Sequence, residues 1–140
     1  MGADGLQRFV DAQNSSGTYA AALAELRAGR KRTHWMWFVF PQVAGLGRSA
    51  MAQRYALSGL GEATAYLGHP VLGPRLLECA RALLSLEETD PVAVLGPVDA
   101  QKLRSSMTLF ARAAPEETVF TEVLARFFGG EPDPETLARV

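Results

Sequence analysis

A dense group of cationic, aromatic and amide side chains lies between positions 30 and 42 of the chain. Arg30 and Lys31 open this segment, and Trp37 and Gln42 lie towards its end. Cationic side chains hold phosphate groups, and an aromatic ring can stack on a nucleobase. The amide of Gln42 can both donate to and accept from the polar edge of such a base. The segment therefore predicts contacts to an anionic, planar ligand.

The same segment holds one residue suited to moving a proton. Histidine titrates near neutral pH, so His34 is the candidate general acid or base if the protein is an enzyme. The alternative is structural, with Trp35, Phe38 and Phe40 in the core. The neighbouring basic residues would then interact with the carboxyl end of the preceding helix. Both interpretations stay open from the sequence.

A second polar cluster lies on a predicted helix in the last third of the chain. Lys102 and Ser106 are four residues apart, so they share one face of this helix, and Ser105 lies beside them. A lysine next to hydroxyl groups can bind a phosphate. Hydroxyls inside a helix can instead bond to the carbonyl of the preceding turn. We expect Lys102 or Ser106 to line one pocket together with His34 or Trp37, because a single ligand site needs these polar groups to converge.

The loop that follows the aromatic segment has two glycines and ends at Arg48 and Ser49. Backbone N–H groups at such a helix start can approach an anion, so Arg48 is a further candidate ligand contact. The loop lacks the lysine and hydroxyl pair of a Walker sequence, and no strand precedes it, as a Rossmann fingerprint requires. A plain turn with Ser49 as the N-cap is the favoured interpretation.

Metal and cofactor chemistry is not indicated by the sequence. The two histidines and the single cysteine are well separated, without the spacing that metal ligands need. We therefore expect no metal and no cofactor. Cys79 falls in a helical apolar stripe and is expected to be buried, and a lone thiol fits a reducing compartment.

Apolar residues recur at helical spacing along the chain, and glycine and proline separate the stretches. The only strand-like run is the aromatic segment 35–41, and a lone strand has no partner. We predict a buried short helix or an irregular segment there. No alternation of strands and helices is visible, so the sequence predicts an all-α fold. We expect one compact domain over residues 1–140, built of about six to eight short helices.

Composition and charge exclude several classes of protein. Apolar residues make up 48% of the 140 positions and charged residues 21%, which is typical of a globular domain. The net charge of -1 gives no general attraction to nucleic acid, so we do not expect it as a partner. We see no leader and no run long enough to span a bilayer, so we expect a cytoplasmic protein without membrane contact. The oligomeric state stays open.

Several strings together resemble the bacterial domain of unknown function 1810 family, some members of which carry the label calpastatin. The resemblance covers nearly the whole chain, and its strings are Leu6–Gln13, Lys31–Gln42, Gly45–Ser49, His69–Gly73, and Asp99 with Lys102–Phe110. It implies a single small, mostly helical domain and no established activity. The order of an aromatic and glutamine segment, a His-Pro helix start and a later Asp/Lys helix is also similar to domains that act on ADP-ribose or riboside-linked substrates.

These observations lead to two functional hypotheses. The first is a pocket for a nucleotide-like or phosphorylated small ligand, which as an enzyme would be an ADP-ribose or riboside-type hydrolase. The alternative is a non-catalytic helical module that binds another protein through an aromatic surface. Whether the protein is an enzyme stays open. The two hypotheses differ in whether the cations and aromatics meet in one cleft.

Overall fold

The computed structural model describes residues 2–140. The described chain forms ten α-helices and one short 3₁₀ helix, without a strand of regular sheet, so the predicted all-α fold is confirmed. Six helices have nine residues or more and build the body of the domain, and the rest are short connecting turns. The elements are α1 (Gly2–Asn14), η1 (Ser15–Gly17), α2 (Thr18–Ala28), α3 (Met36–Val39), α4 (Ala50–Arg54), α5 (Leu60–Gly68), α6 (Leu72–Leu84), α7 (Pro91–Leu95), α8 (Pro97–Ala113), α9 (Val119–Phe128) and α10 (Pro134–Leu137).

Local signals in the sequence set where these helices begin and end. The Oγ atom of Ser49 accepts a hydrogen bond from the N–H of Ala52 and so caps α4, as predicted. Proline occupies the first turn of α7, α8 and α10, where its missing N–H costs nothing. Gly29 and Gly129 end α2 and α9 in the left-handed conformation that glycine adopts without strain.

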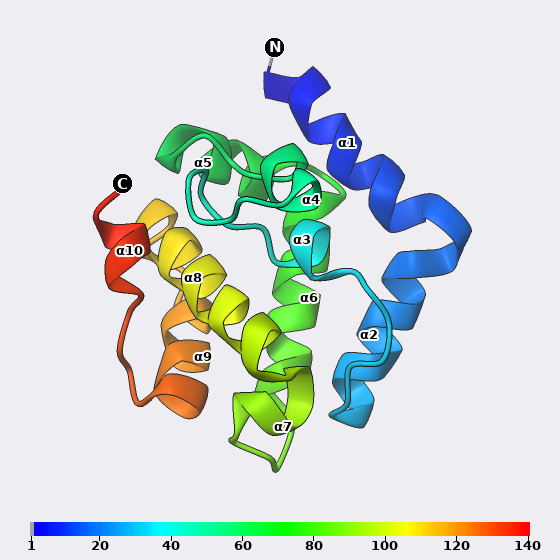
Figure 1. Cartoon of the computed structure of the whole chain (residues 1–140), viewed down its shortest axis with the longest axis vertical. Coiled ribbons are helices and arrows are strands. Elements are labelled where there is room, and N and C mark those ends of the chain that lie inside the picture. Colours follow the sequence, from blue (N-terminus) through cyan, green and yellow to red (C-terminus); the bar gives the residue numbers. More distant parts are fainter. Residues whose placement is uncertain (1) are drawn as a thin grey trace.

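Helix α6 lies in the middle of the domain (Figure 1). It packs against α2, α5 and α9, and α8 packs against α5, α7, α9 and α10. The apolar stripe of α6 is fully buried, which includes Cys79 as predicted. Burial raises the pKa of the Cys79 thiol to about 12. Along the described residues, no helix combines the length and the apolar character needed to cross a bilayer.

Aromatic rings in contact run through the core from α1 to α9. Phe9 meets Tyr66 edge-on at 5.2 Å between ring centroids, Tyr66 meets Phe110 at 5.5 Å, and Phe110 meets Phe120 at 5.6 Å. The tilted and edge-on geometries are those that aromatic pairs prefer. These contacts join helices that are distant in the sequence, so they fix the frame on which α8 and the segment before α4 are held.

The aromatic segment at 35–41 contains the short helix α3, and most of its side chains are buried. The prediction of a buried short helix or irregular segment is thus confirmed. After it the chain runs to a single bridge between Val43 and Leu57, where Ala44 donates to the Leu57 carbonyl at 2.7 Å. The bridge holds the start of the loop 43–49. This arrangement places Gln42 and Gly47 near the beginning of α8.

Candidate functional site

A single carboxylate holds the segment between α2 and α3 in place. One oxygen of Glu25 accepts hydrogen bonds from the backbone N–H groups of Arg32 and Thr33 and from the indole N–H of Trp35, at 2.8, 3.0 and 2.9 Å. The other oxygen accepts from the Thr33 hydroxyl at 2.7 Å. Burial alone would raise the pKa of Glu25, but these hydrogen bonds outweigh it and lower the pKa to about 2. The ionised carboxylate therefore orders the segment that carries the predicted site.

Lys31 turns inward from this segment, and its side chain is only 8% exposed. Its Nζ atom lies 2.9 Å from Oδ2 of Asp99 and donates to the carbonyl of Thr33 at 2.5 Å. The same ammonium lies 5.1 Å from the ring centroid of the buried Trp35. Its backbone N–H also donates to the carbonyl of Val94 at 2.8 Å. Lys31 therefore ties the segment to α7 and α8, and two of its three ammonium hydrogens already have partners.

Lys102 repeats this arrangement on the solvent side. Its Nζ atom lies 3.6 Å from Oδ1 of Asp99 and 4.9 Å from the ring centroid of the half-buried Trp37. Neither contact is short enough to be a hydrogen bond, and the side chain is 21% exposed. The structure thus brings Trp37 and Lys102 into contact, whereas their sharing of one ligand pocket stays a prediction. The ammonium group of Lys102 therefore makes no hydrogen bond among the described residues, whereas that of Lys31 has two close partners.

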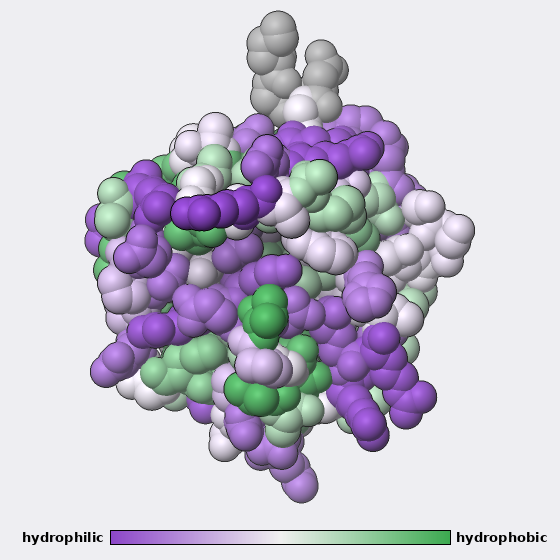
Figure 2. All heavy atoms as spheres, in the orientation of Figure 1, coloured by the Kyte–Doolittle hydropathy of each residue, from purple (hydrophilic) through white to green (hydrophobic). Residues whose placement is uncertain are grey.

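Lys102 forms part of an open groove of about 350 Å³ between the loop 43–49 and α8. We call this the Lys102 groove, and its lining residues are Gln42, Leu46, Gly47, Val98, Gln101 and Lys102. Val98 is 68% exposed, although it is a large apolar side chain. Figure 2 shows hydrophobic surface over α7 and the beginning of α8, bordered by hydrophilic side chains. The groove thus combines apolar walls with two amides and one ammonium group.

The charge around the groove favours an anion. Two lysines, Lys31 and Lys102, share the one carboxylate of Asp99, which leaves this group with one net positive charge. Asp99 and Lys102 lie in the first two turns of α8, where the helix dipole is positive. A cation in this position does not profit from the dipole, but an anion bound to it would.

Apart from Gln42, the predicted contacts from the first half of the chain lie outside the lining of the groove, Lys31 and Trp37 included. Arg30, His34 and Arg48 are all exposed. Arg30 follows the end of α2, and His34 lies between α2 and α3. Arg48 precedes the cap of α4, and its carbonyl accepts from the Gln53 side chain at 2.9 Å. Their role in ligand binding stays a prediction.

The hydroxyl of Ser105 contacts Asp133, near the carboxyl end of the chain, and does not line the groove. It donates to Oδ2 of Asp133 at 2.8 Å, and the hydroxyl of Thr136 donates to the same oxygen at 2.6 Å. Asp133 is 3% exposed, and its N–H donates to the Thr108 hydroxyl at 2.8 Å. Burial by itself raises the pKa of Asp133, but the bonds from Thr136 and Ser105 prevail and hold it below its usual range. Two hydroxyls of α8 thus anchor α10.

Ser106 has a different environment from its neighbour. It is fully buried, and its Oγ atom has no hydrogen-bond partner among the described residues. A buried hydroxyl without a partner is destabilising. The structure gives no account of this hydroxyl, and its role as a ligand contact stays a prediction.

Several residues of the site are absent from the sequence-based prediction. Leu46, Val98 and Gln101 line the groove, and Val98, Gln101 and Lys102 follow the i, i+3, i+4 spacing of one helix face. That spacing, with an apolar residue on an otherwise polar helix face, was the signal in the sequence that could have identified the groove-lining residues of α8. Asp133 precedes Pro134, which is a recognised helix start. Among the described residues, no three His, Cys, Asp or Glu side chains gather where they could hold a metal ion.

The fold and the groove define a small all-α protein with a cationic, partly apolar surface groove. The chain belongs to the family described as protein of unknown function (DUF1810), whose profile matches residues 3–140. It is similar to the crystal structure of the conserved hypothetical protein Rv1873 from Mycobacterium tuberculosis, with 51% sequence identity and a TM-score of 0.91. The alignment covers 95% of this chain and 94% of that one. No curated protein matches the chain.

Proposed function

We propose that this protein binds a small phosphorylated, nucleotide-like ligand in the Lys102 groove. The observation that carries the proposal is the contrast between the two lysines on Asp99. The Lys31 side chain is only 8% exposed and has hydrogen-bond partners, while Lys102 lines the groove and has no hydrogen-bond partner among the described residues. An ammonium group in this setting offers its hydrogens to a phosphate.

The lining of the groove suggests the class of ligand. Leu46 and Val98 lie on opposite walls, and such apolar walls suit the faces of a planar ring. The amides of Gln42 and Gln101 provide donors and acceptors for the edge of a base. The volume of about 350 Å³ lies at the lower end of the ~300–1,000 Å³ typical of ligand pockets, which fits a mononucleotide.

The proposal is for binding and not for turnover. The candidate acid or base, His34, is exposed and does not line the groove. General acid–base catalysis needs the side chain within hydrogen-bond reach of the reacting group, directly or through one water. A hydrolase acting on ADP-ribose or a riboside therefore has less support from this arrangement than a binding protein has.

One observation favours a second candidate function, a surface that binds another protein. Val98 and Val92 are large apolar side chains that are 68% and 47% exposed, and Leu46 lies near the former across the groove. Exposed apolar surface rimmed by polar residues marks interaction sites. Such binding would depend on Val98 and would not need a phosphate.

A binding panel separates the two functions. We expect adenosine 5′-monophosphate to raise the thermal midpoint and to shift the amide resonances of residues 42–47 and 98–102, whereas adenosine has a weaker effect. Lys102→Met removes the proposed charged hydrogen bond to the phosphate of the ligand, which is worth about 1.5–3 kcal/mol, and should weaken binding roughly 10- to 100-fold. Lys102→Arg should retain part of the affinity, because the guanidinium also donates to phosphate.

Arg112→Met is the matched control, because Arg112 is an exposed cation at the far end of the same helix. It should leave binding unchanged. Failure of adenosine 5′-monophosphate, ribose 5-phosphate and inorganic phosphate alike to bind the wild-type protein would refute the proposal. So would binding that Lys102→Met leaves intact.

A further inference from the structure

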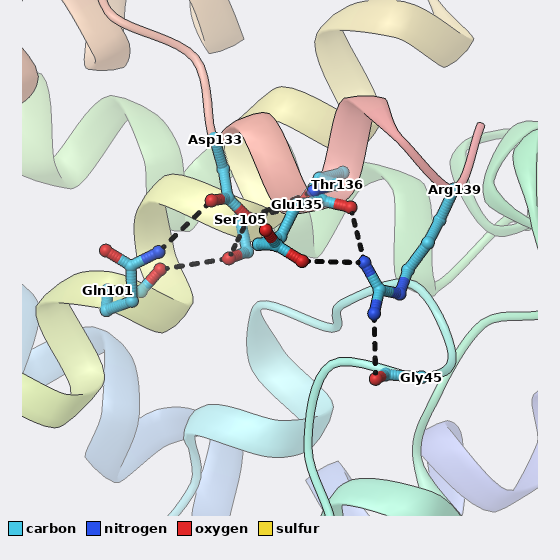
Figure 3. A network of polar contacts seen from close by, with 7 residues as sticks. All are labelled: Gly45, Gln101, Ser105, Asp133, Glu135, Thr136 and Arg139. Carbon is cyan, nitrogen blue, oxygen red and sulfur yellow. Dashed lines mark hydrogen bonds and ion pairs between the residues drawn. The ribbon is translucent and has the colours of Figure 1, made fainter.

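One short segment at the end of the chain contacts both α8 and the loop 43–49, the two elements between which the Lys102 groove lies. Figure 3 shows this segment, with Asp133 on one side of α10 and Arg139 on the other. Asp133 reaches Gln101, which lines the groove, and Arg139 reaches Gly45, the residue before the lining residue Leu46. The two walls come from parts of the chain that are more than fifty residues apart. The segment is therefore placed to fix the distance between them.

The Asp133 end is firmly anchored on α8. Its Oδ2 atom accepts from the hydroxyls of Ser105 and Thr136, and its own N–H donates to Thr108. Its Oδ1 atom accepts from Nε2 of Gln101 at 3.3 Å. Because Gln101 lines the groove, this carboxylate restrains an amide that a ligand would meet.

The Arg139 end holds the tip of the loop. Its Nη1 atom donates to the carbonyl of Glu135 at 2.9 Å and lies 3.1 Å from the Glu135 carboxylate, so the guanidinium is oriented by α10 itself. Its Nη2 atom donates to the carbonyl of Gly45 at 3.4 Å.

Gly45 is the residue that permits this contact. It has φ +97°, a conformation that other residues adopt only with strain. A Cβ atom at this position would also lie 3.0 Å from Nε of Arg139. Both the backbone conformation and the close approach of the guanidinium therefore call for glycine.

The loop has other restraints besides Arg139, since the half-buried Leu46 packs against the hydrophobic core. The hydrogen bond from the Ala44 N–H to the Leu57 carbonyl fixes the start, and Gly47 packs closely on Ala52 of α4. Between these points lies Leu46, which lines the groove. Arg139 thus adds a restraint at Gly45, directly beside Leu46.

We propose that Arg139, with Asp133, is a positioning residue for the Lys102 groove, and that α10 acts as a strut that sets the separation of its two walls. The expected effect of Arg139 on ligand affinity rests on the proposed function of the groove. The structural part of the proposal, the restraint of the loop, stands independently of any ligand. Neither residue needs to touch the ligand.

Arg139→Ala tests the strut through hydrogen exchange of the amides of residues 45–48. We expect exchange there to become several-fold faster, while the thermal midpoint changes little because Arg139 makes an exposed ion pair. Arg139→Lys should restore part of the protection, since one ammonium hydrogen can reach the Gly45 carbonyl. Arg126→Ala is the matched control, because Arg126 also donates to a backbone carbonyl, that of Leu86, away from the groove.

Affinity for adenosine 5′-monophosphate is the second readout. We expect Arg139→Ala to weaken binding about three- to tenfold and Arg126→Ala to leave it unchanged. Unchanged exchange at residues 45–48 in Arg139→Ala would overturn the strut whatever the ligand does. Faster exchange with unchanged affinity would overturn the positioning role. If the wild-type protein does not bind the nucleotide, the proposed function fails, and exchange alone still decides whether Arg139 restrains the loop.

Discussion

Lys31 and Lys102 lie beside the two oxygens of one carboxylate, with their Nζ atoms 2.9 Å from Oδ2 and 3.6 Å from Oδ1 of Asp99. Each ammonium also lies over a tryptophan ring, Trp35 for Lys31 and Trp37 for Lys102. The two halves of this arrangement differ in exposure and in hydrogen bonding. From this difference we infer a structural role for Lys31, and the proposed function gives Lys102 the contact to the ligand.

The two lysines should therefore respond in opposite ways to the same substitution. Lys31→Met removes a partly buried charged hydrogen bond, so we predict a loss of about 1.5–3 kcal/mol in the free energy of unfolding. Lys102→Met removes a longer, more exposed contact, and we predict a loss below about 1 kcal/mol. Urea unfolding of both variants measures the difference. Equal losses would contradict the division of roles.

Glu25 should make stability depend on pH in the acid range. Its pKa is lowered from 4.5 to about 2 in the folded state, so its contribution is fully present above pH 4.5. The contribution decreases as the pH falls towards 2, because the folded carboxylate then takes up its proton. The free energy of unfolding of the wild type should exceed that of Glu25→Gln by on the order of 2 kcal/mol at pH 7, and this difference should disappear at low pH.

The exposed carboxylate of Glu87 gives the control for this experiment. Glu87→Gln should unfold at the same urea concentration as the wild type at pH 7. A gap between wild type and Glu25→Gln that stays constant from pH 7 to pH 2 would show that the Glu25 charge does not hold the segment.

Two adjacent serines provide a third test. Ser105→Ala leaves the buried Asp133 carboxylate without one donor, and we predict a loss of about 1–3 kcal/mol in unfolding free energy. Ser106→Ala removes a buried hydroxyl without a partner among the described residues, and we predict a change below about 1 kcal/mol or a gain. Thermal and urea unfolding check both. A larger loss for Ser106→Ala than for Ser105→Ala would rule out this account of α8.

Cys79 should be unreactive in the folded protein. It is fully buried, and burial raises its pKa to about 12, so little thiolate is present at neutral pH. We predict that a thiol reagent labels the native protein about a hundredfold or more slowly than the urea-unfolded protein. Rapid labelling of the native chain, followed by mass spectrometry, would contradict the burial of this side chain.

The fold was predictable because its signals are local. Pro97 at the start of α8, Ser49 at the start of α4 and Gly129 at the end of α9 act through their own backbone geometry. The apolar spacing of α6 likewise identifies its buried face without knowledge of its neighbours.

The site was only partly predictable, because burial decides the role of each polar residue. Lys31 and Lys102 look alike in the sequence, and tertiary packing alone makes one an internal partner and the other a surface cation. Glu25 gave no signal, since its partners are backbone amides that a later loop brings to it. The sequence singles out Ser105 as a candidate ligand contact, but its hydroxyl donates to Asp133, which lies 28 residues further on.

The two tryptophans, only two positions apart, lie in opposite environments, and this gives the protein a built-in optical reporter. Trp35 is buried with its indole N–H bonded to Glu25, so a collisional quencher such as acrylamide should not reach it. Trp37 is half-buried beneath the Lys102 ammonium. Because the chain has no other tryptophan, any change in quenchable emission reports on Trp37. Occupancy beside Lys102 can thus be followed by intrinsic fluorescence, without a dye or a label.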